Sequence, residues 1–108
     1  ELGLAPFRRD AGLDALARAH ALRMKAVGRV GHDVGDGDPK TRIERSDVVA
    51  RKAGENVAHA ENVTHAHRAL YASPSHRENL IHPDFDRFGL AVVNDADGTV
   101  WVAELFAK

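Results

Sequence analysis

The sequence contains no cysteine and only one methionine, one tryptophan and one tyrosine. No disulfide can therefore contribute to stability, and the fold has to depend on its hydrophobic core. No apolar run approaches the roughly 20 residues needed to span a bilayer, which argues against a membrane-spanning segment. Charge of one sign is not in excess either. The net charge is −1, and acidic and basic residues are interleaved, so nucleic acid is not an expected partner.

What is present is typical of one folded globular domain. The chain has 108 residues, of which 44% are apolar and 29% charged. This is long enough to bury roughly two thirds of the surface of the unfolded chain. There is no internal repeat, low-complexity tract or linker-like stretch. The sequence begins at Glu1 with neither an initiator methionine nor a signal peptide, so we interpret it as a mature or excised domain.

Two segments, 10–27 and 61–72, carry apolar residues at spacings of three and four, which predicts amphipathic helices. Asp10 is a candidate N-cap for the first helix, and Gly28 is a candidate stop signal. Asn62 is a candidate N-cap for the second helix. The region 28–39 is expected to be a loop because it is rich in glycine and aspartate, and residues 41–53 are expected to be weakly helical.

The last quarter of the chain predicts a β-hairpin. Two apolar runs, 88–93 and 99–106, flank a polar segment in which Asp97-Gly98 supplies turn chemistry. Neither run alternates cleanly between apolar and polar residues, so both faces of these strands must be covered. Helices on both sides of a small sheet then give an α/β/α three-layer sandwich around a central antiparallel sheet.

Two short motifs carry a family resemblance. Gly54-Glu55-Asn56-Val57-Ala58 is followed by Ser73-Pro74-Ser75-His76-Arg77-Glu78-Asn79-Leu80, and a lone His32 lies upstream in the Gly/Asp-rich loop. This order resembles the CAP superfamily (cysteine-rich secretory proteins, antigen 5, pathogenesis-related 1), and most closely its bacterial SCP-like branch. Eukaryotic members usually carry disulfides, so the absence of cysteine favours a bacterial member.

The resemblance implies a PR-1-like sandwich over residues 1–108 as a single domain, with the usual N-terminal helical segment trimmed. It implies residues 55–58 as a strand and an extracellular or cell-envelope location. It also brings His32, His76 and Glu55 to one cleft, where Ser73 and Asn56 are further candidate lining residues. The family's additional acidic residue, on the helix before the second histidine, has no counterpart here, and Ser73 falls at about that place.

Two imidazoles and one carboxylate form a ligand set that suits Zn²⁺ or another divalent cation, with positions left open for water or a ligand. The long separations between these residues in the sequence do not by themselves indicate a metal motif. A structural interpretation therefore stays open, in which Glu55 accepts backbone hydrogen bonds and His76 only packs. The aspartates at 33, 36 and 38 do not match a calcium-binding EF-hand, and a solvated acidic loop explains them better.

Three functions are compatible with these residues. The first is a binding domain whose cleft holds a cation and takes a lipid, a cell-wall component or a protein. The second is a metal-assisted, peptidase-like hydrolase in which Glu55 is the general base, with His76 beside it. The third is a structural or interaction module with a vestigial cleft. A serine nucleophile at Ser73 or Ser75 is disfavoured because neither lies in a Gly-x-Ser-x-Gly turn.

Overall fold

The computed structural model describes residues 8–72 and 85–108. Within these ranges, three helices and four strands follow one another in this order: β1 (Arg8–Arg9), α1 (Ala11–Val27), α2 (Pro39–Glu44), β2 (Ala53–Ala60), α3 (Val63–Ala72), β3 (Arg87–Asn94) and β4 (Val100–Ala107). Among the described residues, no helix combines the length and the apolar character that crossing a membrane requires.

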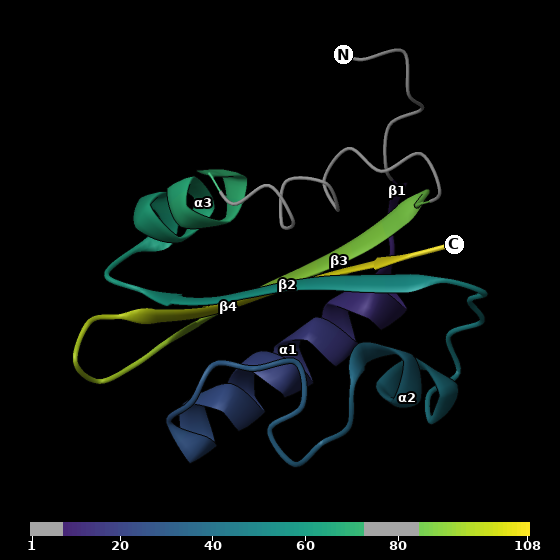
Figure 1. The fold of residues 1–108 in the computed structure, drawn as a ribbon, viewed down its shortest axis with the longest axis horizontal. Helices are drawn as coiled ribbons and strands as arrows, with labels where there is room; N and C mark the ends of the chain where they lie inside the picture. The colour runs from purple at the N-terminus through teal and green to yellow at the C-terminus, as the bar shows by residue number, and fades with distance from the viewer. Residues whose placement is uncertain (1–7, 73–84) are drawn as a thin grey trace.

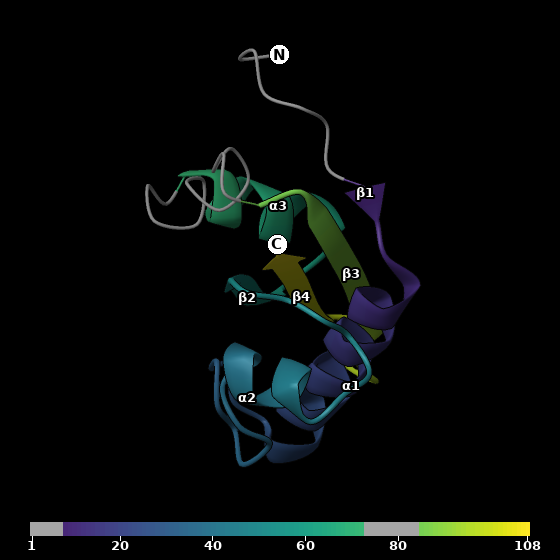
Figure 2. The ribbon, with the colours of Figure 1, turned by 90° about the vertical axis from the view of Figure 1, so that its right-hand side faces the viewer.

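The strands form one sheet in the order β1-β3-β4-β2. β4 pairs antiparallel with both β2 and β3, and the short β1 runs parallel to β3. In Figure 1 the sheet is seen on edge, with α3 on one side and α1 and α2 on the other, and Figure 2 shows the same layers after a quarter turn. The predicted three-layer α/β/α sandwich is confirmed, and β1 is a parallel addition to the expected antiparallel sheet.

The first helix begins and ends where its capping residues predict. The Asp10 carboxylate accepts a hydrogen bond from Leu13 N–H at 2.9 Å, which satisfies one of the free donors of the first turn. Gly28 ends the helix in the left-handed conformation at φ 71°, which an L side chain rarely adopts. The second predicted cap is also present, since Asn62 Oδ1 accepts from His65 N–H at the start of α3.

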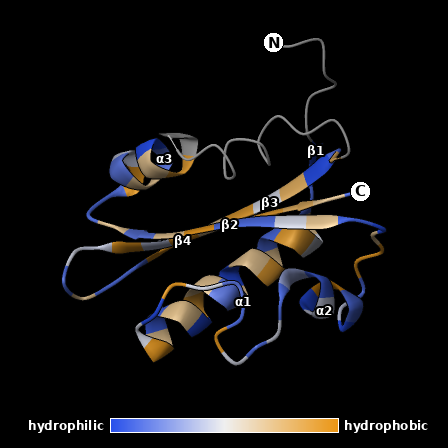
Figure 3. Cartoon of the chain, in the orientation of Figure 1, coloured by the Kyte–Doolittle hydropathy of each residue, from blue (hydrophilic) through white to orange (hydrophobic). Residues whose placement is uncertain are grey.

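α1 packs very closely on the sheet, and a glycine permits this approach. A Cβ atom added to Gly89 of β3 would lie 2.2 Å from the carbonyl carbon of Leu13 and 2.3 Å from the nitrogen of Asp14. The α1 backbone therefore rests directly on β3 at this point. Figure 3 shows the apolar residues gathered along α1 and the central strands. The core on this face includes the fully buried residues Leu13, Ala17, Ala21, Met24 and Leu105.

β4 is buried on both faces, as its apolar run, interrupted only by Glu104, predicts. Its Trp101, Ala103 and Leu105 contribute to the core beneath α1. Val100 and Val102 pack with Ala66 in a smaller cluster under α3. β4, the last strand in the sequence, lies between β3 and β2 in the sheet and packs against both layers of helices.

The middle of the chain differs from the prediction. The helix expected over 41–53 starts two residues earlier, because Asp38 caps it through Thr41 N–H and Pro39 occupies its first turn. It ends at Glu44, and residues 45–52 lead irregularly to β2. The strand expected at 55–58 is longer, 53–60, because all eight residues pair with β4.

Candidate functional site

β2 places two neighbouring polar residues on opposite faces of the sheet, because successive side chains of a strand alternate. Glu55 points toward α1 and α2, and its side chain has no solvent-exposed surface. Asn56 is also fully buried, on the α3 side, where its amide donates to Glu104 Oε1 at 3.1 Å. Of the two, only Glu55 therefore lies on the face that carries the predicted histidine.

The Glu55 carboxylate is held by a buried arginine from α2. Arg42 Nη2 donates to both carboxylate oxygens, each at 2.7 Å. The same guanidinium also donates to the carbonyl oxygens of Gly37, at 2.9 Å, and His32, at 3.0 Å. Its Nη1 is buried and has no hydrogen-bond partner in the part of the chain that the structure describes. Arg42 thus joins α2, the preceding loop and β2 around one negative charge.

His32 is brought to this carboxylate by the loop, as predicted. Its Nδ1 lies 3.0 Å from Glu55 Oε1, while half of its side chain is exposed to solvent. The hydrogen bond to Glu55 raises the pKa of His32 above its ordinary value of 6.5, and partial burial and the nearby Arg42 oppose this only in part. The buried carboxylate orients the ring, and Nε2 is the nitrogen left to face a ligand.

A second histidine supports the network from α1. His20 is fully buried, with Nδ1 2.6 Å from Asp36 Oδ2 and Nε2 2.8 Å from the Gly31 carbonyl oxygen. Burial opposes ionisation of Asp36, but its hydrogen bonds with His20 and with Val34 N–H outweigh that effect and lower its pKa. The His20 Nε2 atom also lies 3.6 Å from Glu55 Oε1. The loop that carries His32 is therefore tied to α1 at a fixed position.

The structure accordingly brings together two of the predicted site residues, His32 and Glu55, and places Asn56 on the other face of the sheet. His76 and Ser73 lie outside the described residues. Sequence reasoning missed Arg42, and it interpreted Asp36 as part of a solvated loop, whereas Asp36 is half-buried against His20. A signal for Arg42 was available, since the Asp38-Pro39 start places it on the first turns of a short helix next to this loop.

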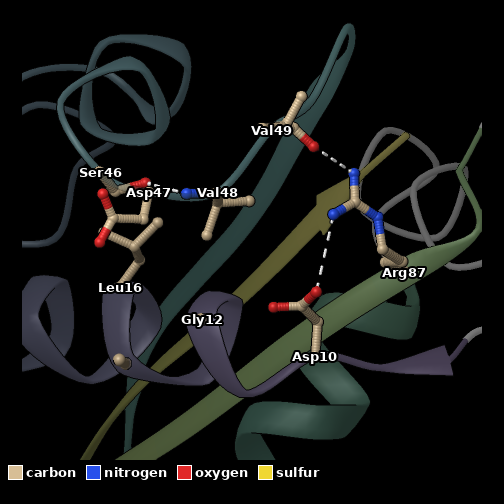
Figure 4. A pocket seen from close by; sticks show the side chains of 9 residues that line it. Asp10, Gly12, Leu16, Ser46, Asp47, Val48, Val49 and Arg87 are labelled. Atoms are coloured by element: carbon tan, nitrogen blue, oxygen red, sulfur yellow. Dashed lines mark hydrogen bonds and ion pairs between the residues drawn. The ribbon is translucent and has the colours of Figure 1, made fainter.

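A separate pocket of about 520 Å³ lies between the start of α1 and residues 46–49. Figure 4 shows Arg87 at its edge, held by the Val49 carbonyl oxygen at 2.7 Å and by Asp10 at 3.6 Å. His32, Glu55 and Asn56 do not line this pocket. Because the guanidinium already has these partners, it serves here to hold the 46–49 segment against β3.

Comparison with known proteins gives one family. The family model described as CAP, cysteine-rich secretory protein family, matches residues 1–105. A protein of Bacillus subtilis (strain 168), YkwD, described as uncharacterized, is 28% identical over 98% of this chain. The matched region covers 41% of YkwD, so the chain spans less than half the length of this relative.

Solved structures show the same fold. An outer surface protein from Borrelia burgdorferi has a TM-score of 0.91 and is 26% identical in sequence. The match covers 99% of this chain and 80% of the Borrelia chain. An extracellular protein containing a SCP domain, from Bacillus anthracis str. Ames, has a TM-score of 0.85 and is also 26% identical. The match covers 97% of this chain and 34% of the Bacillus anthracis chain.

Proposed function

This chain belongs to the cysteine-rich secretory protein (CAP) family, and from that premise we propose that it is an extracytoplasmic binding domain whose cleft holds a divalent cation beside His32 and His76. The relatives described as an outer surface protein and as an extracellular protein support the location. The cation provides one contact point for a ligand, which we place among lipids, cell-wall components and proteins.

The observation that carries the proposal is the pairing of a half-exposed imidazole with a fully buried carboxylate. His32 Nδ1 lies 3.0 Å from Glu55 Oε1. When Nδ1–H donates to a carboxylate, the ring is fixed and the lone pair on Nε2 is made more basic, which is how proteins prepare histidine to bind zinc. Glu55 thus supports the site from behind His32, and His76 is proposed as the second imidazole.

The donor set fits a cation of the Zn²⁺ class. Neutral imidazole nitrogen is a ligand that Zn²⁺ favours, and a site with few protein ligands keeps positions for water or a partner. Arg42 neutralises part of the Glu55 charge at 2.7 Å. We therefore expect a weaker site than one with two free carboxylates, occupied when the cation is abundant.

The same geometry favours binding over hydrolysis. A general base has to reach a water molecule. The Glu55 side chain has no exposed surface, and both of its oxygens accept from Arg42. We therefore place Glu55 in a positioning role.

Titration calorimetry with Zn²⁺ tests the proposal. His32→Gln and His76→Gln should each remove one binding event that the unaltered protein shows. His65→Gln is a matched control, because His65 is also half exposed and lies 3.3 Å from a carboxylate, Glu61, which is itself exposed. An isotherm that is unchanged in both cleft variants would overturn the proposal.

A further inference from the structure

A group of one histidine and two aspartates, side chains of the types that ligate metals, lies at the other end of β2. His59 is near the end of this strand, and Asp95 and Asp97 are in the turn that joins β3 to β4. Each offers one ligand atom, and these atoms all lie within 4.8 Å of one another. His59 is four residues from Glu55, roughly 13 Å along a strand, so this group is separate from the cleft. We propose that His59, Asp95 and Asp97 form a second divalent-cation site.

The only tryptophan of the chain positions two of the three ligands. The His59 ring stacks on Trp101, its cross-strand partner, with ring centroids 3.7 Å apart and the planes 5° from parallel. Trp101 Nε1–H donates to Asp95 Oδ2 at 2.9 Å. Trp101 is itself buried in the core. A rigid indole therefore fixes both the imidazole plane and one carboxylate.

Thr99 positions the third ligand and links it to the imidazole. Its N–H and its hydroxyl both donate to Asp97 Oδ1, at 2.9 Å and 2.5 Å, and the hydroxyl oxygen lies 2.6 Å from His59 Nε2. These hydrogen bonds from Thr99 hold the pKa of Asp97 below its ordinary value. His59 and Asp97 are thus already bridged through one hydroxyl group, an arrangement that a shared cation can replace.

The ligand chemistry selects the class of ion. One imidazole nitrogen with two carboxylate oxygens suits Zn²⁺ and similar first-row cations, whereas Ca²⁺ and Mg²⁺ prefer oxygen alone. Ligands about 2.1 Å from an ion with tetrahedral geometry lie about 3.4 Å apart, so movements of up to ~1 Å per side chain close the site. His59 and Asp97 are exposed, which leaves the remaining positions of the ion to water.

Trp101 also provides the test, because the chain contains no other tryptophan. Zn²⁺ added to the full chain should change the Trp101 fluorescence saturably. His59→Gln and Asp97→Asn should each weaken this response by about tenfold or more, since even loss of a group that only supports a ligand costs about 10- to 100-fold. His65→Gln and the cleft variant His32→Gln should leave it unchanged.

The controls separate this site from the cleft and from folding. Asp97→Asn keeps a side-chain oxygen that can accept from Thr99 N–H, so this variant stays informative if His59→Gln folds poorly. A response lost in His32→Gln would assign the fluorescence change to the cleft and overturn the second site. The absence of any saturable change, or a change that persists in both hairpin variants, would also overturn it.

Discussion

The buried ion pair between Arg42 and Glu55 gives the sharpest prediction about stability. Arg42→Met keeps most of the aliphatic stem but removes the charge. Glu55 would then lose both of its 2.7 Å contacts in a place where its side chain has no access to solvent. Removing one partner of such a pair costs about 3–5 kcal/mol, because the other charge stays buried without its counter-charge.

That loss is large against the whole free energy of unfolding, which for a domain is about 5–15 kcal/mol. In a domain of roughly 100 residues each kcal/mol lowers the melting temperature by about 4–8 °C. We therefore expect Arg42→Met to melt at least about 12 °C lower. The measurement is urea and thermal unfolding followed by far-ultraviolet circular dichroism.

A double-mutant cycle isolates the pair from the other contacts of Arg42. Arg42→Met combined with Glu55→Leu removes both charges, so the double variant should cost less than the two single variants added together. The coupling free energy should lie at the upper end of the roughly 0.5–3 kcal/mol that residues in contact usually show. A loss below about 1 kcal/mol in Arg42→Met, or strict additivity, would refute the reasoning.

Two further predictions concern the helix–sheet contact and the cleft. Gly89→Ala should lower the free energy of unfolding by about 3 kcal/mol or more, because its Cβ would meet backbone atoms of Leu13 that cannot move aside. Gly12→Ala is the control, since its Cβ would meet only side-chain atoms, those of Val48 and Asp10. With chelator present, the free energy of unfolding of the unaltered protein should exceed that of His32→Gln by its largest amount below about pH 6.5. This difference should shrink as the pH rises above that value.

The sign of the pH effect follows from the raised pKa of His32. The folded state binds the imidazole proton more tightly than the unfolded state, so protonation stabilises the fold, and this gain disappears as pH rises through the folded-state pKa. Urea unfolding at about pH 5.5 and about pH 8.5 measures both limits. A difference that grows with pH would contradict the His32–Glu55 contact. For the glycine prediction, an equal loss of unfolding free energy in Gly89→Ala and in Gly12→Ala would contradict the close packing of α1 on β3.

The elements that were predictable from sequence are those that local patterns determine. α1 has a regular apolar stripe between Asp10 and Gly28, and the β3–β4 hairpin has two apolar runs around a turn. β2 is different, because Ala53–Ala60 mixes glycine, glutamate, asparagine and histidine and has no strand pattern of its own. Its identification depended on the family resemblance. β1 has only Arg8 and Arg9, and its partner on β3 lies far along the chain.

The candidate site shows the same division. The resemblance predicted that His32 and Glu55 would meet, and the structure places them 3.0 Å apart. The partners Arg42, Asp36 and His20 come from three different segments. The Asp38-Pro39 helix start places Arg42 near the loop, but no short-range pattern pairs its guanidinium with Glu55. Their roles follow from burial, because a charge without solvent requires a counter-charge or hydrogen bonds. Which residues supply them depends on how the helices pack, which the sequence pattern did not contain.

The central position of β4 has a consequence for how the chain first folds. Neither β2 nor β3 has its long antiparallel neighbour until residues 100–107 have been synthesised, because both pair with that strand. While the ribosome makes the residues before β4, α1 has no complete sheet to cover its apolar stripe. Before β4 is available, β2 and β3 therefore have no strand between them, and the core beneath α1 lacks Trp101, Ala103 and Leu105, so the native packing of α1 depends on the last strand of the chain.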